Sequence, residues 1–450
     1  MYDTQQLVQR DLEYVLHPMQ GRIDEAQPPL VIVKGQGAVI TDTEGNEYID
    51  GLAGLWNVNV GHGRAELAEA AAEQMRTLAY ASGYYGSSNV AAIKLAARLA
   101  DLAPGDLKAT FYTTGGAESN ETAFKLARFY WKIVGRPDKV KIISLQGGYH
   151  GLTTGAMSAT GIRTFWQRFD PLQAGFHHIP NYYCFRCTLH KHYPECNVAC
   201  ADTLEQQILA EDPETVAAFI AEPVQGAGGV ITPPPEYFPK IREICDRYDV
   251  LFIGDEVITG FGRTGKWFGL EHWGVVCDLM SFAKGITSAY MPLGGIMVSE
   301  KVHRIFRELP EGVVFSHAYT YSLHPVCCAV ALKNLDILER ENLVARSAVL
   351  GERLQSGLRQ LESLPGVGEV RGLGLMAAVE LAADKQGTPL PAPLMGTSKV
   401  VSEARTRGLL TRYRGDSILI SPPMVVTEEQ VDRIVNILGA AIKAVLPSGA

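Results

Sequence analysis

The 450-residue sequence lacks the features of several large classes of protein. No apolar run approaches the roughly 20 residues that span a bilayer, and the first residues, MYDTQQLVQRDLEYVL, have neither the basic start nor the apolar stretch of a signal peptide. There is no basic excess, because the formal net charge is −8, and this disfavours nucleic acid as a partner. Internal repeats and low-complexity segments are also missing. We therefore expect a cytoplasmic globular protein with neither a membrane nor a nucleic-acid partner.

Disulfide bonds are not expected either, although the chain has eight cysteines, because the cytosol keeps thiols reduced. Half of them cluster with two histidines in one short segment: Cys184, Cys187, Cys196, Cys200, His190 and His192. Such a group would suit zinc. However, the second pair has the looser C-x3-C spacing, and the alternative is a surface loop with free thiols. We assign no metal site.

What the sequence does contain is an alternation of helical patterns with short apolar strands, which is typical of an α/β fold with a mainly parallel sheet. The candidate strands are 110–113, 140–145, 217–221, 250–254, 279–283 and 295–298, with helices at 118–134 and 239–248 between them. A β-meander pattern precedes this region, and helices and strands follow it. We expect a large domain at 61–325 and a smaller α+β domain built from 1–60 and 326–450, with a mobile loop at 385–397.

Polar residues at the ends of these strands carry the candidate chemistry. Asp255 directly follows an apolar strand, and ligands of open α/β sheets bind at the carboxyl ends of strands. An enzyme that uses pyridoxal 5′-phosphate (PLP) needs a carboxylate there, because it keeps the pyridine nitrogen protonated and lets the ring absorb electrons. The alternative role for Asp255 is a helix N-cap.

Lys284 also lies just past a strand end, in SFAKG. Partial burial there would lower its pKa and make it a usable amine nucleophile for a Schiff base and later a proton carrier. A lysine that extends along the protein surface is the alternative.

Two further strand ends could complete a cofactor site. TTGGAES places Gly115, Gly116 and Ala117 where a helix begins, and backbone N–H groups there can hold a phosphate. QGGYHG places Tyr149 where its ring could stack on a flat cofactor. A plain turn and a core tyrosine are the alternatives, but the four signals occur together, each at a strand end.

The same motifs resemble those of the class III aminotransferases, the ω-transaminase group of fold-type I PLP enzymes. The resemblance covers nearly the whole chain, from TTGGAES and QGGYHG through AEPVQGAGG, GDEVITGFGRTG, FAKGITSAYMPLGG and AYTYSLHP to RYRGDSILISPPMV. It implies a PLP-dependent transferase fold of type I and a homodimer, or a tetramer, with active sites at the interface.

The resemblance also implies roles for individual residues. Lys284 would be the Schiff-base lysine and Asp255 the partner of the pyridinium. Val257 and Tyr149 would contact the two faces of the cofactor ring, and Gly115, Gly116 and Ala117 would bind its phosphate. Glu222 and Gln225 would lie near its phenolic edge. Thr320 would reach the phosphate from the neighbouring subunit.

Within the family, the chain is similar to the pyruvate-dependent amine transaminases. The implied substrate contacts are Trp56, Tyr84, Tyr85, Tyr149, Ala227 and Arg412. Arg412 would pair bidentately with the carboxylate of a substrate and would swing away when the substrate is an amine without a carboxylate. Arg414 is the other candidate for this role. For both arginines, the alternative is a salt bridge on the protein surface.

The predicted activity is a ping-pong transfer of an amino group from a primary amine or ω-amino acid to a keto acid, with pyruvate giving alanine. The alternative is another fold-type I PLP activity, such as that of a racemase, an aminomutase or a decarboxylase. A binding protein without catalysis would be expected to lack Lys284 or Asp255, and both are present.

Overall fold

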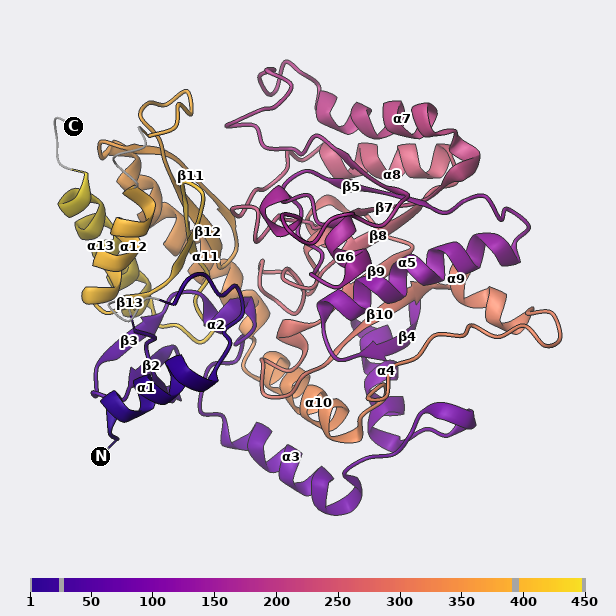
Figure 1. The fold of residues 1–450 in the computed structure, drawn as a ribbon, viewed down its shortest axis with the longest axis horizontal. Helices are drawn as coiled ribbons and strands as arrows, with labels where there is room; N and C mark the ends of the chain where they lie inside the picture. Colours follow the sequence, from indigo (N-terminus) through magenta and orange to yellow (C-terminus); the bar gives the residue numbers. More distant parts are fainter. Residues whose placement is uncertain (1, 24–27, 391–395, 447–450) are drawn as a thin grey trace.

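The computed structural model describes residues 2–23, 28–390 and 396–446. Figure 1 shows two lobes, one holding a large central sheet and the other combining the N-terminal and C-terminal parts of the chain. Within the described ranges, no helix is both long and apolar enough to cross a membrane. Part of the predicted loop 385–397, residues 391–395, lies outside the described residues.

The larger lobe is built on a seven-stranded sheet with the order β4-β10-β9-β8-β7-β5-β6. Its strands are β4 (Leu107–Thr113), β5 (Lys141–Leu145), β6 (Phe176–Ile179), β7 (Val216–Ala221), β8 (Leu251–Asp255), β9 (Leu279–Phe282) and β10 (Gly294–Ser299). β10 runs in the direction opposite to that of the other strands of this sheet. The predicted α/β class with a mainly parallel sheet is therefore confirmed, and each of the six predicted strands is present within a few residues. The prediction omitted β6.

Helices cover both faces of this sheet, so that its central strands are buried on both sides and read as continuous apolar runs. These helices are α4 (Val90–Leu102), α5 (Gly116–Ile133), α6 (Thr154–Ala159), α7 (Ala199–Glu211), α8 (Tyr237–Arg247) and α9 (Glu300–His303). Two longer elements, α3 (Ala65–Leu78) and α10 (Pro325–Arg340), pack against each other, and α10 also packs against α4.

The smaller lobe contains two four-stranded sheets, β1-β2-β3-β13 and β11-β12-β15-β14. Their strands are β1 (Ile32–Gln36), β2 (Val39–Asp42), β3 (Glu47–Asp50), β11 (Val367–Leu373), β12 (Met376–Leu381), β13 (Leu409–Leu410), β14 (Arg412–Arg414) and β15 (Ser417–Ile420). The helices are α1 (Thr4–Tyr14), α2 (Ala53–Trp56), α11 (Leu343–Arg359), α12 (Gly396–Thr406) and α13 (Glu428–Val445). The first sheet joins distant parts of the chain, because Ile49 of β3 pairs in parallel with Leu409 of β13.

The large sheet brings the predicted strand-end residues to one edge. Glu222 follows β7, Asp255 ends β8, and Lys284 lies two residues after β9. Gly116 begins α5 shortly after β4, and Tyr149 follows β5. Because β5, β7, β8 and β9 are parallel, their carboxyl ends meet on the same side.

Candidate active site

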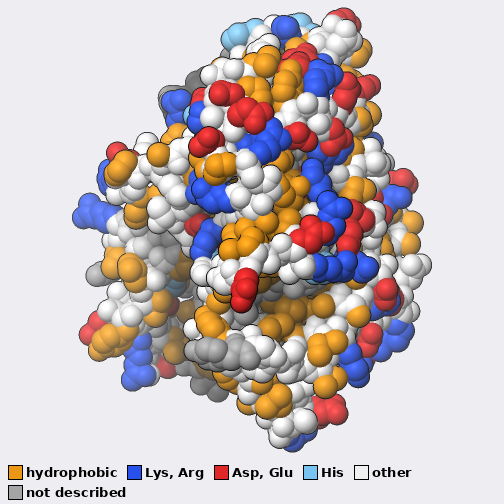
Figure 2. All heavy atoms as spheres, turned by 90° about the vertical axis from the view of Figure 1, so that its right-hand side faces the viewer, with side chains coloured by type: hydrophobic (Ala, Val, Ile, Leu, Met, Phe, Trp, Pro, Cys, Tyr) orange, Lys and Arg blue, Asp and Glu red, His pale blue; other side chains and the backbone are white. Residues whose placement is uncertain are grey.

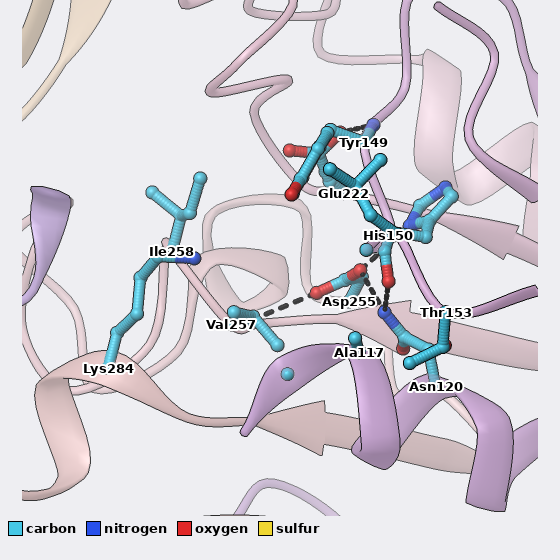
Figure 3. A pocket seen from close by; sticks show the side chains of 13 residues that line it. Ala117, Asn120, Tyr149, His150, Thr153, Glu222, Asp255, Val257, Ile258 and Lys284 are labelled. Carbon is cyan, nitrogen blue, oxygen red and sulfur yellow. Dashed lines mark hydrogen bonds and ion pairs between the residues drawn. The ribbon is translucent and has the colours of Figure 1, made fainter. Parts of the chain in front are cut away.

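A cavity of about 430 Å³ opens at this edge of the sheet. It is lined by Gly116, Ala117, Asn120, Tyr149, His150, Gly151, Leu152, Thr153, Glu222, Asp255, Val257, Ile258 and Lys284. Figure 3 shows Lys284 on one side of the cavity and Tyr149, Glu222 and His150 on the other, with Asp255 between them. The strand-end residues predicted from the sequence thus share one space.

The Asp255 carboxylate is buried and held by three donors. Its Oδ2 lies 2.7 Å from Nδ1 of His150 and accepts a hydrogen bond of 2.8 Å from the side chain of Asn120. Its Oδ1 accepts a bond of 3.1 Å from the backbone N–H of Val257. These three partners fix the orientation of the carboxylate.

Lys284 has a conformation that is uncommon for a residue with a side chain. Its φ is +47°, in the left-handed region that disfavours residues other than glycine. Strain of this kind often marks a functional site, where the surrounding structure must hold it. Burial lowers the pKa of the Lys284 amine, while the charges of Asp255 and Glu222 act in the opposite direction.

Glu222 connects two walls of the cavity. Its Oε2 accepts a hydrogen bond of 2.8 Å from the backbone N–H of Tyr149, and its Oε1 accepts one of 3.0 Å from that of Gly226. Burial raises the pKa of this carboxyl to about 7. The Tyr149 ring is held in turn by the edge of Phe165, with ring centroids 5.4 Å apart.

The start of α5 lies against Val257. A Cβ atom at Gly116 would be 2.8 Å from the Val257 side chain, so only glycine allows this close approach. The N-cap residue Gly115 supplies no side-chain hydrogen bond. The first N–H groups of the helix therefore remain available for an anion, as helix starts generally allow.

The structure places other predicted contacts outside this cavity. Trp56 is buried in an apolar cluster with Ile258, which itself lines the cavity. Ala227 is half-buried in the loop after Glu222. Gln225 does not face the cavity, because its amide group donates to the carbonyl of Gln146 at 3.0 Å and accepts from Asn181.

The two candidate arginines lie on β14, close to Tyr149. The charge of Arg412 acts on the Tyr149 hydroxyl, whose pKa is raised mainly by burial and lowered by this arginine. The Arg414 guanidinium sits over the Phe165 ring at 5.9 Å and donates to the Thr164 hydroxyl at 3.4 Å. Arg412 is the more exposed of the two and is bound less by its own chain.

Two of the residues expected to serve a neighbouring subunit, Thr320 and Tyr84, do not line the cavity of their own chain. Thr320 is exposed, and its carbonyl accepts a hydrogen bond of 2.7 Å from Tyr80. Tyr84 is 42% exposed and lies in the loop before α4. The backbone of Tyr85 lies in the same loop, but its side chain is outside the described parts of the structure.

The four clustered cysteines line one small cavity of about 20 Å³ as free thiols. Burial raises the pKa of Cys184 to about 11 and that of Cys200 to about 12. Both thiols therefore hold their proton more tightly than an exposed thiol does. Across the described residues, no group of three or more His, Cys, Asp or Glu is placed to hold a metal ion. The zinc alternative gains no support.

Sequence reasoning missed Asn120 and His150, the two side chains that bind Asp255. His150 stands inside QGGYHG, directly after Tyr149, and Asn120 is the residue that follows TTGGAES. No local pattern indicated that they would meet a carboxylate on another strand.

Comparison with known proteins agrees with this geometry. Residues 22–442 match the family described as Aminotransferase class-III. A putrescine–pyruvate aminotransferase of Pseudomonas aeruginosa is 42% identical over 90% of this chain and 89% of its own length. A thermostable (S)-enantioselective ω-transaminase of Thermomicrobium roseum superposes with a TM-score of 0.95 at 46% identity, over 99% and 100% of the two chains. The ω-transaminase of Pseudomonas jessenii in complex with PMP gives a TM-score of 0.95 at 38% identity over 98% of both chains. The chain therefore belongs to the class III aminotransferases, which are PLP-dependent transferases of fold type I.

Proposed function

We propose that this aminotransferase moves the amino group of a primary amine or ω-amino acid to pyruvate, giving alanine. The observation that carries the proposal is that Lys284 and Asp255 face one cavity from the ends of adjacent strands, β9 and β8. The putrescine–pyruvate aminotransferase of P. aeruginosa supports pyruvate as the acceptor.

The residues of the cavity fit PLP. The uncapped start of α5 at Gly115, Gly116 and Ala117 suits its phosphate. Val257 and Tyr149 line the cavity and would contact the two faces of its ring. Asp255, oriented by three donors, suits the ring nitrogen. When bound, PLP stabilises the negative charge that develops on the substrate carbon.

Lys284 would both hold the cofactor and carry the proton. Its lowered pKa leaves a larger neutral fraction of the amine, which is the form that attacks a carbonyl. Once released by the incoming amine substrate, the same nitrogen would move a proton from the donor carbon to the cofactor carbon. Asp255 would hold a proton at the pyridine nitrogen throughout.

Arg412 would bind the carboxylate of the keto acid. It is exposed, and its charge acts on the hydroxyl of Tyr149, which lines the cavity. An arginine fork suits a carboxylate. The partial burial of Arg414 against Phe165 makes it the poorer candidate.

We also propose a homodimer in which a second copy of the chain completes each site. Figure 2 shows hydrophobic side chains gathered in a band on one face of the molecule. Large exposed apolar residues occur in α4 and in the loop before α10, among them Val90, Ile93 and Val314. Burying such residues against a second copy would also bring the exposed Tyr84 and Thr320, and the loop that contains Tyr85, towards the partner's cavity.

The cytoplasm is the compartment that we propose. All eight cysteines are free thiols, and free thiols persist in a reducing compartment.

A half-reaction separates this function from that of a racemase, an aminomutase or a decarboxylase. Given an amine alone, a transaminase converts its bound cofactor to the amino form, which the near-ultraviolet and visible absorption reports. Later addition of pyruvate should restore the original spectrum and release one alanine per site. A protein that turns over an amino acid but never accumulates the amino form of its cofactor would contradict the proposal.

A further inference from the structure

The guanidinium of Arg371, on β11, lies between two segments of chain and binds both. Its side chain is only 9% exposed. Nε and Nη2 both donate to the carbonyl of Gly229, at 3.0 and 2.7 Å. Nη2 also donates to Glu380 at 2.8 Å and to the hydroxyl of Ser417 at 2.7 Å, while Nη1 donates to Glu369 at 2.8 Å.

The first segment is the loop that follows Glu222. It carries Ala227 and is tied to the cavity, because Glu222 accepts the N–H of Gly226. At Gly229 the backbone has a φ of +124°, and a Cβ atom there would lie 3.1 Å from Nη2 of Arg371. A side chain at position 229 would therefore crowd the guanidinium.

The second segment is the hairpin of β14 and β15, which presents Arg412. Ser417 begins β15 and pairs with Arg414, and Leu419 on the same strand pairs with Arg412. The Ser417 hydroxyl also donates to Glu380, which accepts from Arg371 as well. One guanidinium thus binds both the loop that carries Ala227 and the hairpin that carries Arg412.

Tyr183 and Arg186, which lie next to two of the clustered cysteines, contact the same arrangement. The ring of Tyr183 lies over the Arg371 guanidinium at 4.8 Å. Arg186 donates to Asp416, in the turn of the hairpin, at 2.7 Å and pairs with Glu380 at 3.3 Å. The hairpin is therefore held at its turn and at the start of β15.

A merely structural ion pair would need only carboxylates around the guanidinium. Here two N–H groups converge on a single backbone carbonyl, and a third donor binds a hydroxyl on another strand. A planar fork with five donors holds such partners at fixed positions, which a lysine cannot do. Misplacing a binding group by about 1 Å can cost up to about a hundredfold in rate.

We infer that Arg371 is a positioning residue for the keto acid: it sets the separation between the loop of Ala227 and the hairpin of Arg412. This inference rests on the proposed role of Arg412. It assigns to Arg371 no contact with substrate or cofactor.

The test compares Arg371→Gln and Arg371→Lys with a matched control, Arg353→Gln, in the cofactor-loaded enzyme. Arg353 makes ion pairs with Asp432 and Glu428 that are as short, but both partners lie on α13. Two readouts are taken: the KM for pyruvate against that for a monoamine without a carboxylate, and hydrogen exchange of the amides in 225–231 and 412–420.

We expect Arg371→Gln to raise the KM for pyruvate roughly tenfold and to change the KM for the monoamine less than about threefold. Amide exchange should accelerate in both segments, and Arg371→Lys should not restore either property. Arg353→Gln should change neither segment.

If amide hydrogen exchange in Arg371→Gln is unchanged in either segment, Arg371 does not join the two segments, whatever the activity of the variant. Accelerated exchange in both segments with an unaltered KM for pyruvate would overturn the positioning role, if Arg412→Ala raises that KM. If Arg412→Ala leaves the KM for pyruvate unchanged, the proposed role of Arg412 is wrong and the positioning role of Arg371 falls with it. Exchange then still tells whether Arg371 joins the two segments.

Discussion

The two sides of the cavity are built differently. On the sheet side, Asp255 is buried and held by a histidine, an amide and a backbone N–H, all from elements that pack on the central strands. On the side proposed to bind the keto acid, Arg412 is exposed and lies on a three-residue strand of the smaller lobe. Rigid placement suits the role proposed for Asp255, whereas the role proposed for Arg412, to bind a keto acid and to make way for an amine, needs room to move. Removing residues from each side should therefore damage different steps.

The largest effect should come from Lys284→Ala. Loss of both the nucleophile and the proton carrier should lower kcat by roughly 10³-fold or more. The bound cofactor should also lose the absorption of its lysine-linked form. Lys399→Ala, at an exposed position of α12, serves as the control and should behave as the wild type. A Lys284→Ala enzyme with normal turnover would remove the central assignment.

A smaller but still large effect is expected for Asp255→Asn. Loss of the fixed negative charge should slow the amine half-reaction by roughly 10²- to 10³-fold, as stopped-flow absorption would report. The KM for pyruvate should change much less. His150→Ala should cause the same kind of defect with a smaller magnitude, since it orients the carboxylate without replacing it. Equal loss in binding of both substrates would mean that Asp255 only supports the fold.

On the substrate side, Arg412→Ala should act on the keto acid alone. Removing a charged hydrogen-bond partner costs about 1.5–3 kcal/mol, which corresponds to a rise of roughly ten- to a hundredfold in the KM for pyruvate. The KM for a simple amine should stay within about threefold of the wild-type value. Arg414→Ala is the matched comparison. A larger effect of Arg414→Ala would exchange the roles of the two arginines.

The smallest effect concerns stability and the carboxyl of Glu222. Its pKa is about 7 in the folded protein, against about 4.3 in an unfolded chain. The folded state therefore binds the proton more tightly, so this group contributes stability at acidic pH that is lost as the pH rises through 7. Glu222→Gln should flatten the fall in the free energy of unfolding between pH 5 and 8. Denaturant unfolding measures the slope, and Glu352→Gln, exposed on α11, should leave it unchanged.

The sequence predicted what depends on local pattern. The central strands are short apolar runs, and Lys284, Asp255, Gly116 and Tyr149 each stand beside the end of one. β6 was not predicted because its four residues, FHHI, include two histidines and lack a continuous apolar run.

Contacts between distant segments could not be predicted in this way. His150 and Asn120 lie 105 and 135 positions before Asp255, and Gly229 lies 142 positions before Arg371. No periodicity or spacing within one segment encodes such pairs. They arise from the order of strands in the folded sheets.

The parallel pairing of β3 with β13 has a consequence for how the protein is made. Leu409 is synthesised about 360 positions after Ile49, so β3 lacks this neighbouring strand until then. At a synthesis rate of about 5–20 residues per second, the wait is roughly 20–70 seconds. During that time the meander of β1–β3 presents an unpaired edge while the central sheet is already emerging from the ribosome, and such edges promote aggregation. The nascent chain should therefore need protection at its beginning for longer than at its middle.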